Sequence, residues 1–251
     1  MSEILTAVEN AIFSLTLNRP KKRNALNDAL INELKNALRQ ADKDENLCAI
    51  VIKGAGKDFC SGADLSALQK ISESSVLENL ADAENLMELF SLIRKIKIPV
   101  VAAVHGRALA GGCGLATACD VVLASNTARF GYPEVKIGFV PAMVMAILRR
   151  NLSEKRSFEL ITKGFDFSAE EAEKFGLINH VFPHETFEKD VLEFANEYTK
   201  VSRSAVILSK KLLYQMDGMT FDAALETGAE VNTIARLTED CKRGIVEFLN
   251  K

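Results

Sequence analysis

Two glycine-containing turns and one glutamate are the residues of this chain best suited to chemistry. The first turn is FCSGADL at 59–65 and the second is HGRALAGGCGL at 105–115, so that Gly62 and Gly111 are 49 residues apart. Glu134 follows in the segment FGYPEVKIG. Each turn can present a backbone N–H with little side chain in the way. Two such donors on one carbonyl oxygen form an oxyanion hole, and a carboxylate beside it can move a proton at the neighbouring carbon.

Alternating strands and helices are expected to position these turns. Apolar runs predict strands at 4–8 and 11–17, joined by a tight turn, and at 48–52, 100–104 and 120–124. Asn27 is a suitable N-cap for a helix that reaches about residue 41, and a second helix is expected over 75–96, before Pro99. A third helix should begin at Gly111. Each glycine turn therefore follows an apolar strand.

Beyond about Pro133 the pattern becomes helical. Pro141 suits the first position of a helix, and Ser168 with Glu171 forms a capping box for a helix that ends at Gly176. Further helices are expected at 184–199, 202–216 and 220–235. One apolar stripe, which is either ordinary core or a partner surface, runs along the last of them: Phe221, Leu225, Gly228, Val231 and Ile234. No low-complexity linker divides the chain, so we expect one continuous unit with a core at 1–195 and a helical region at 196–251.

Composition limits the class of protein. Of the 251 residues, 48% are apolar, enough for a substantial core, and a net charge of −3 argues against a nucleic-acid binder driven by bulk positive charge. The first residues do not resemble a signal peptide, and the least charged long stretch, 108–128, is a poor membrane span. The five cysteines show no metal-ligand spacing. We therefore expect a cytoplasmic protein with reduced thiols and no metal.

Around these residues the chain resembles the enoyl-CoA hydratase/isomerase (crotonase) family. The two turns and the glutamate segment match, as do LNRP with NAL at 17–26, CDVV at 119–122, and SAEEA with FGLIN at 168–179. The resemblance covers roughly residues 3–250 and implies an α/β fold: a crotonase-like (ClpP/crotonase) spiral of ββα repeats with a C-terminal helical trimerisation module. It also implies a homotrimer or a dimer of trimers, an acyl-CoA substrate from fatty acid metabolism, and no cofactor.

The resemblance assigns roles to individual residues. The N–H groups of Ala63 and Gly111 are the oxyanion-hole donors, and Glu134 is the proton-transfer residue. Phe130, Tyr132, Ile137 or Phe139 would desolvate Glu134 and raise its pKa. The LysLysArg run at 21–23 is either a site for CoA phosphates or a solvated cluster. Substrate contacts are expected from Lys22, Arg23, Ala25, Ser61, Asp64, Leu65, Gly112 and Pro133.

Two departures from the family pattern affect the expected reaction. The first glycine of the family's three-glycine run is Ala110, and Gly114 stands where typical hydratases carry a second glutamate. Two carboxylates suit hydration, whereas one suits a double-bond shift, so Gly114 slightly favours an isomerase over a hydratase. Asp120, the nearest other carboxylate in sequence, is expected to be structural.

Other readings remain open at the sequence level. They are a decarboxylase, a thioester hydrolase and a non-catalytic acyl-CoA-binding protein. Cys60 and Cys113 adjoin the turns, but neither shows a histidine partner in the sequence, so a thiolate nucleophile is not expected. His105 is not expected to be catalytic.

Overall fold

A six-stranded sheet forms the centre of the protein in a computed structural model that describes residues 2–250, except the side chains of Leu65 and Leu68. The first two strands are antiparallel and the others join in parallel. In spatial order the strands are β1 (Ile4–Glu9), β2 (Ile12–Leu17), β3 (Ala49–Gly54), β4 (Val100–Val104), β6 (Val121–Ser125) and β9 (His180–Phe182).

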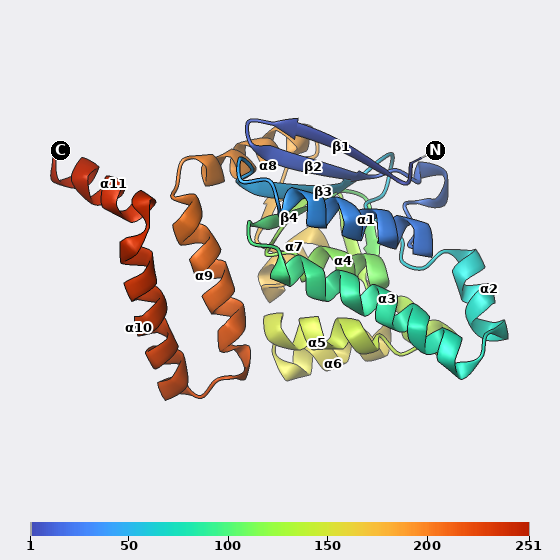
Figure 1. Cartoon of the computed structure of the whole chain (residues 1–251). Coiled ribbons are helices and arrows are strands. Elements are labelled where there is room, and N and C mark those ends of the chain that lie inside the picture. Colours follow the sequence, from blue (N-terminus) through green and yellow to red (C-terminus); the bar gives the residue numbers. More distant parts are fainter. Residues whose placement is uncertain (1, 251) are drawn as a thin grey trace.

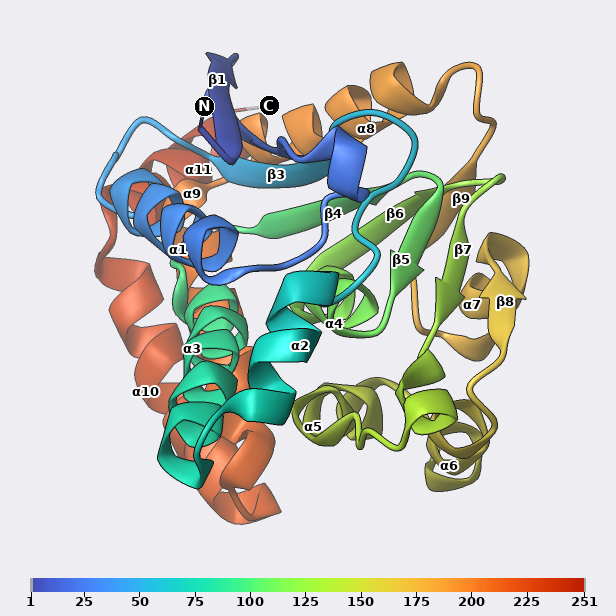
Figure 2. The same ribbon diagram turned by 90° about the vertical axis from the view of Figure 1, so that its right-hand side faces the viewer.

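A second, three-stranded sheet stands beside the first (Figure 2). Its strands are β5 (Arg107–Leu109), β7 (Arg129–Gly131) and β8 (Asp166–Ser168), of which β5 and β7 are parallel. Strand β4 of the large sheet leads into β5, and β6 leads into β7, before the chain turns into helix. This repeated strand–strand–helix order is the expected ββα pattern.

Helices cover both faces of the large sheet (Figures 1 and 2). The helices of the described residues are α1 (Asp28–Ala41), α2 (Leu65–Glu73), α3 (Val76–Lys95), α4 (Gly111–Ala118), α5 (Ala142–Asn151), α6 (Glu154–Lys163), α7 (Ala169–Phe175), α8 (Phe187–Asn196), α9 (Arg203–Gln215), α10 (Phe221–Leu237) and α11 (Glu239–Leu249), of which α10 and α11 lie away from the sheet. Short 3-10 helices are η1 (Pro20–Lys22), η2 (Pro133–Ile137), η3 (Glu197–Thr199) and η4 (Met216–Gly218).

The core has two parts because the sheet is buried on both sides. The larger part lies between the sheet and α1, α3 and α4, and the smaller part lies under α8, where Phe187 and Val191 pack on Val51 and Leu123. Parallel strands buried on both faces read as continuous apolar runs, which explains why 49–52 and 100–104 lack alternation.

Local signals in the sequence predicted the long elements well. The Asn27 side chain accepts a hydrogen bond from Leu30 N at 2.8 Å, and the capping box of Ser168 and Glu171 is present. Pro141 is the residue before α5 rather than its first residue. The short strands β5, β7, β8 and β9 were not predicted, because three residues carry no period. The helices α2, α6 and α11 were missed although Asp64, Ser153 and Thr238 cap them.

The C-terminal helices follow α8 and extend from the core (Figure 1). Helix α9 is fixed by a buried network in which Lys210 Nζ and Tyr214 Oη contact the Asp120 carboxylate at 2.6 and 2.5 Å. Asp120 also accepts from Val100 N at 2.6 Å, which confirms its expected structural role. None of the helices within residues 2–250 combines the length and the hydropathy that a membrane span needs.

Candidate active site

Backbone pairing brings the two glycine turns together. Cys60 N donates to Arg107 O at 3.0 Å, and Leu109 N donates to Cys60 O at 3.0 Å. These bonds make Cys60 a one-residue parallel partner of Ala108 in β5. The first turn thus lies along the edge of β5, the strand from which the second turn leaves, although their sequences are far apart.

Beyond this bridge the turns are in direct contact. Gly62 has φ +94°, a backbone conformation that favours glycine. A Cβ at this position would lie 2.8 Å from the Ala110 Cβ and 3.7 Å from Gly111 N. Glycine is therefore required here both by the conformation and by the close approach of the second turn.

The N–H of Ala63 is free to meet a ligand. Its two neighbours are bound to Leu26: Leu26 N donates to Gly62 O at 2.7 Å, and Asp64 N donates to Leu26 O at 2.9 Å. Because successive backbone groups of an extended segment point to opposite sides, the Ala63 N–H faces away from Leu26. Ala63 is exposed, and its N–H donates to no backbone carbonyl within residues 2–250.

Gly111 supplies the second free N–H. It is the first residue of α4, so its N–H has no acceptor in the preceding turn, and the helix dipole favours negative charge there. Ala110, before it, has φ 50° and ψ −128°, a conformation that costs a non-glycine residue about 1–3 kcal/mol. Ala110 N donates to Gly131 O at 2.9 Å. The departure from three glycines is thus accommodated with local strain.

Glu134 lies in η2, directly after Pro133. Its Oε2 atom is buried and has no hydrogen-bond partner among the described residues, and burial raises its pKa above the ordinary value. The shift of the Glu134 pKa has the expected direction, and the four side chains expected to desolvate Glu134 differ in burial. Tyr132 is fully buried, as is Phe130, whereas Ile137 and Phe139 are exposed.

The space beside Gly114 is filled by apolar side chains. A Cβ built on Gly114 would lie 2.7 Å from Val144 Cγ2 in α5 and 3.0 Å from Phe90 Cζ in α3. Both residues are buried. The position at which typical hydratases carry a second glutamate therefore has no carboxylate and no vacant room for one.

The predicted substrate-contact residues in and near the first turn differ in exposure. Lys22 and Arg23 are exposed, and the Arg23 carbonyl accepts a hydrogen bond from Ser61 N at 3.1 Å, so the basic run contacts the first turn. Ala25 and Asp64 are buried, and Asp64 makes contacts within the protein. Leu65 begins α2, but its side chain lies outside the described residues.

The two other predicted contacts lie in the second turn and near Glu134. Gly112 packs on the first turn, because a Cβ there would lie 2.3 Å from Cys60 O, so its absent side chain serves close packing. Pro133 is half-buried and begins η2.

Cys60, Cys113 and His105 lie in or beside the two turns. Burial raises the pKa of Cys60 and of Cys113 to about 12, so both thiols keep their protons at neutral pH. His105 Nε2 lies 3.0 Å from the Gly56 carbonyl oxygen, a contact between two loops.

Two residues of the quoted N-terminal motif have roles that the sequence reading missed. Arg19 contacts Asp64 beside the first turn, and buried Asn24 donates to Ala55 O at 2.9 Å and to Asp58 O at 2.7 Å. Their presence in the matched motif was the available signal. The arrangement of two free N–H groups at adjoining turns can stabilise an oxyanion.

Comparison with known proteins agrees with this fold and site. The enoyl-CoA hydratase/isomerase family matches residues 7–251. A relative from Thermus thermophilus is 39% identical, with 94% of this chain and 93% of the relative covered. The 2,3-dehydroadipyl-CoA hydratase of Escherichia coli is 34% identical, with 100% and 97% covered. The crystal structure of an enoyl-CoA hydratase from Mycobacterium smegmatis has a TM-score of 0.95 at 28% identity, with 100% and 97% covered.

The chain belongs to the enoyl-CoA hydratase/isomerase family. It has the crotonase fold, as the sequence predicted, and it is an acyl-CoA enzyme of that family.

Proposed function

We propose that this enzyme adds water to the double bond of a 2-enoyl-CoA. The N–H groups of Ala63 and Gly111 bind the thioester oxygen. Glu134 removes a proton from a water molecule as the oxygen of that water attacks C3. The negative charge moves to the thioester oxygen as an enolate, and Glu134 then returns the proton to C2. The observation that carries the proposal is a desolvated carboxylate in the segment that the family places beside these turns.

Hydratase relatives outweigh the isomerase preference that Gly114 suggested. The relative from Escherichia coli and the solved structure from Mycobacterium smegmatis are both described as hydratases. The double-bond shift remains the second candidate because apolar side chains fill the position of the second carboxylate. In that reaction Glu134 would take a proton from one carbon of the acyl chain and return it to another, through the same enolate.

Product analysis separates these reactions. The protein is mixed with 2-enoyl-CoA and, separately, with 3-enoyl-CoA in water labelled with oxygen-18, and the products are weighed by mass spectrometry. A hydratase yields a product heavier by one labelled water, whereas an isomerase yields an unchanged mass with a moved double bond. Release of carbon dioxide or free CoA would indicate a decarboxylase or a thioester hydrolase, and binding without turnover a non-catalytic protein.

Glu134→Gln tests the acid/base assignment. The amide keeps the size of the side chain but cannot exchange the proton, so turnover should fall about 10²–10⁴-fold. Binding of the CoA ester, measured by calorimetry, should stay within a few-fold of wild type. Exposed Glu185→Gln is the matched control and should leave both unchanged. Wild-type turnover by the Glu134 variant would show that another group moves the proton.

The CoA end of the substrate is proposed to reach the basic run. Lys22 and Arg23 offer exposed positive charge for its phosphates, and their loop contacts the first turn through the bond from Ser61 N to Arg23 O. The thioester would then lie at the two turns, with the acyl chain beyond them.

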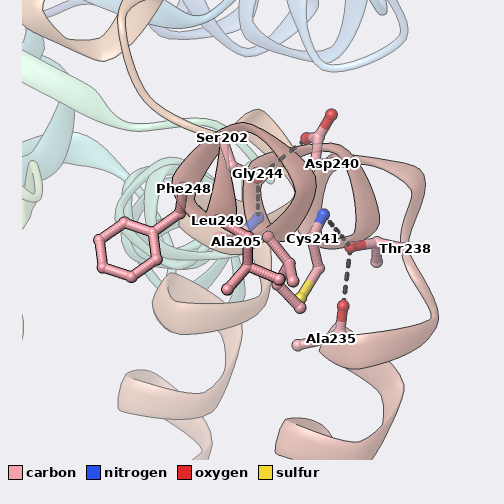
Figure 3. A pocket seen from close by; sticks show the side chains of 10 residues that line it. Ser202, Ala205, Ala235, Thr238, Asp240, Cys241, Gly244, Phe248 and Leu249 are labelled. Atoms are coloured by element: carbon pink, nitrogen blue, oxygen red, sulfur yellow. Dashed lines mark hydrogen bonds between the residues drawn. The ribbon is translucent and has the colours of Figure 1, made fainter. Parts of the chain in front are cut away.

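We also propose a homotrimer or a dimer of trimers. Apolar side chains of α10 and α11 are exposed, among them Phe221 and Leu225 on α10 and Phe248 on α11. A cavity of about 410 Å³ between α9, α10 and α11, away from the two turns, is lined largely by apolar atoms (Figure 3). A stable monomer at micromolar concentration in light scattering would exclude this assembly. Leu225→Glu should weaken it, because the charge would need to lose its water.

A further inference from the structure

Arg19 connects three segments around the first turn. Its Nη2 lies 2.6 Å from Asp64 Oδ2, its Nη1 donates to the Ala25 carbonyl, and its Nε lies 2.5 Å from Glu3 Oε2. The side chain is 12% exposed, so water competes little for these contacts. The contact with Glu3 is an ion pair without hydrogen-bond geometry, whereas Asp64 and Ala25 accept hydrogen bonds from the planar guanidinium at fixed directions.

Asp64 is held from two sides. Its Oδ1 accepts from Ser66 N and Ser66 Oγ, each at 3.0 Å, which makes it the N-cap of α2, and its Oδ2 faces Arg19. Burial acts to raise the pKa of Asp64, but the hydrogen bonds from Ser66 and Arg19 outweigh it and lower that pKa below its ordinary value. The carboxylate is therefore ionised and tightly placed.

These contacts surround the peptide group of Ala63. Asp64 follows Ala63 directly, and Leu26, whose backbone binds both neighbours of Ala63, follows Ala25 directly. Arg19 thus holds the Asp64 side chain and the Ala25 carbonyl, and each of these lies next to a residue of the Leu26–Ala63 bridge. The Ala25 carbonyl shares its peptide group with Leu26 N, which donates to Gly62 O in the peptide that carries the Ala63 N–H.

We propose that Arg19 is a positioning residue that aims the Ala63 N–H at the thioester oxygen and couples this donor to the segment that meets CoA. The inference rests on the proposed function and deepens it. Arg19 touches no reacting atom. Its effect arises because a donor must be within a small distance and angle of the developing charge to stabilise it.

Acetoacetyl-CoA is the probe, because its enolate absorbs ultraviolet light and can be measured while it is bound. At a fixed pH, the fraction of bound probe that is enolate reports the strength of the oxyanion hole without turnover. Arg19→Met keeps much of the side-chain volume but removes every donor. We expect its enolate fraction to fall, and turnover of the enoyl-CoA found above to drop about ten- to a hundredfold. The affinity for free CoA, which has no thioester oxygen, should change less than threefold.

Two further variants keep the test decisive if Arg19→Met does not fold. Asp64→Asn preserves the cap to Ser66 but loses the ion pair, and Arg19→Lys keeps the charge with fewer contacts; both should lower the enolate fraction less than Arg19→Met. Arg39→Met is the matched control, since Arg39 pairs with Glu88 on the surface and Glu88 keeps Lys35 as a partner. It should bind the enolate as wild type does.

The outcomes are separable. Folded Arg19→Met with a wild-type enolate fraction overturns the proposal, as does an equal loss of affinity for free CoA and for the enolate. If the wild type forms the enolate but turns over no enoyl-CoA, the proposed reaction fails, and a lower enolate fraction in Arg19→Met still supports the role of Arg19. If the wild type forms no enolate, the oxyanion hole itself is wrongly assigned and the proposal fails with it.

Discussion

Gly114→Ala should reveal how tightly the position of the missing carboxylate is filled. The added methyl would lie 2.7 Å from Val144 Cγ2, whereas carbon atoms pack best at about 3.5–4.0 Å, so Val144 must move by roughly 1 Å. Such overpacking typically costs about 1–3 kcal/mol. Replacing a helical glycine by alanine returns about 1 kcal/mol. The net effect on the free energy of unfolding is a loss of about 0–2 kcal/mol.

The effect on stability should become more favourable when the Val144 side chain is shortened. In a Val144→Ala background the clash with Cγ2 is absent and the 3.0 Å approach to Phe90 Cζ remains, so Gly114→Ala should stabilise by about 0–1 kcal/mol. Gly244→Ala is the matched control, because Gly244 is helical and a Cβ there meets nothing within 4 Å among the described residues. Urea unfolding at one fixed protein concentration measures all the variants.

A clear result would refute this account of the site. If Gly114→Ala stabilises the wild-type background as much as Gly244→Ala stabilises it, the pocket beside Gly114 is not filled. The same packing bears on chemistry. Gly114→Glu alone should leave the ratio of hydrated to isomerised product unchanged, because Val144 blocks the carboxylate, and only the double variant with Val144→Ala should raise it.

Two further predictions concern the carboxyl groups of Glu134 and Asp120. Burial raises the pKa of Glu134, so between 4.5, its ordinary value, and the raised value the folded chain holds a proton that the unfolded chain has lost. The stability of wild type relative to Glu134→Gln should therefore fall as pH rises through this window; a difference that urea unfolding shows to be independent of pH would contradict it. Lys210→Met leaves the Asp120 carboxylate, 14% exposed, without its cation and should cost about 3–5 kcal/mol, partly restored by Asp120→Asn. If Lys210→Met unfolded at the same temperature as the wild type, this destabilisation would be disproved.

Much of the fold was readable from the sequence because its signals are local. Caps such as Asn27 and the Ser168–Glu171 box act over three residues, and apolar periodicity marks a helix or a buried strand within one segment. The ends of α1, α3 and α10 were predicted to within about two residues for this reason. The three-residue strands of the second sheet were not, since they exist only through pairing with distant segments.

The sequence by itself determined which groups are available for chemistry: two glycine turns, one glutamate after Pro133, and no second acid at Gly114. Only the tertiary structure decided how they are arranged. The bridge from Cys60 to Ala108 brings the turns together, packing covers Glu134 Oε2 and raises the pKa of that carboxyl, and Arg19 reaches Asp64 across 45 residues. Residue types are written in the chain, but the direction of an N–H and the solvation of a carboxylate depend on contacts between distant segments.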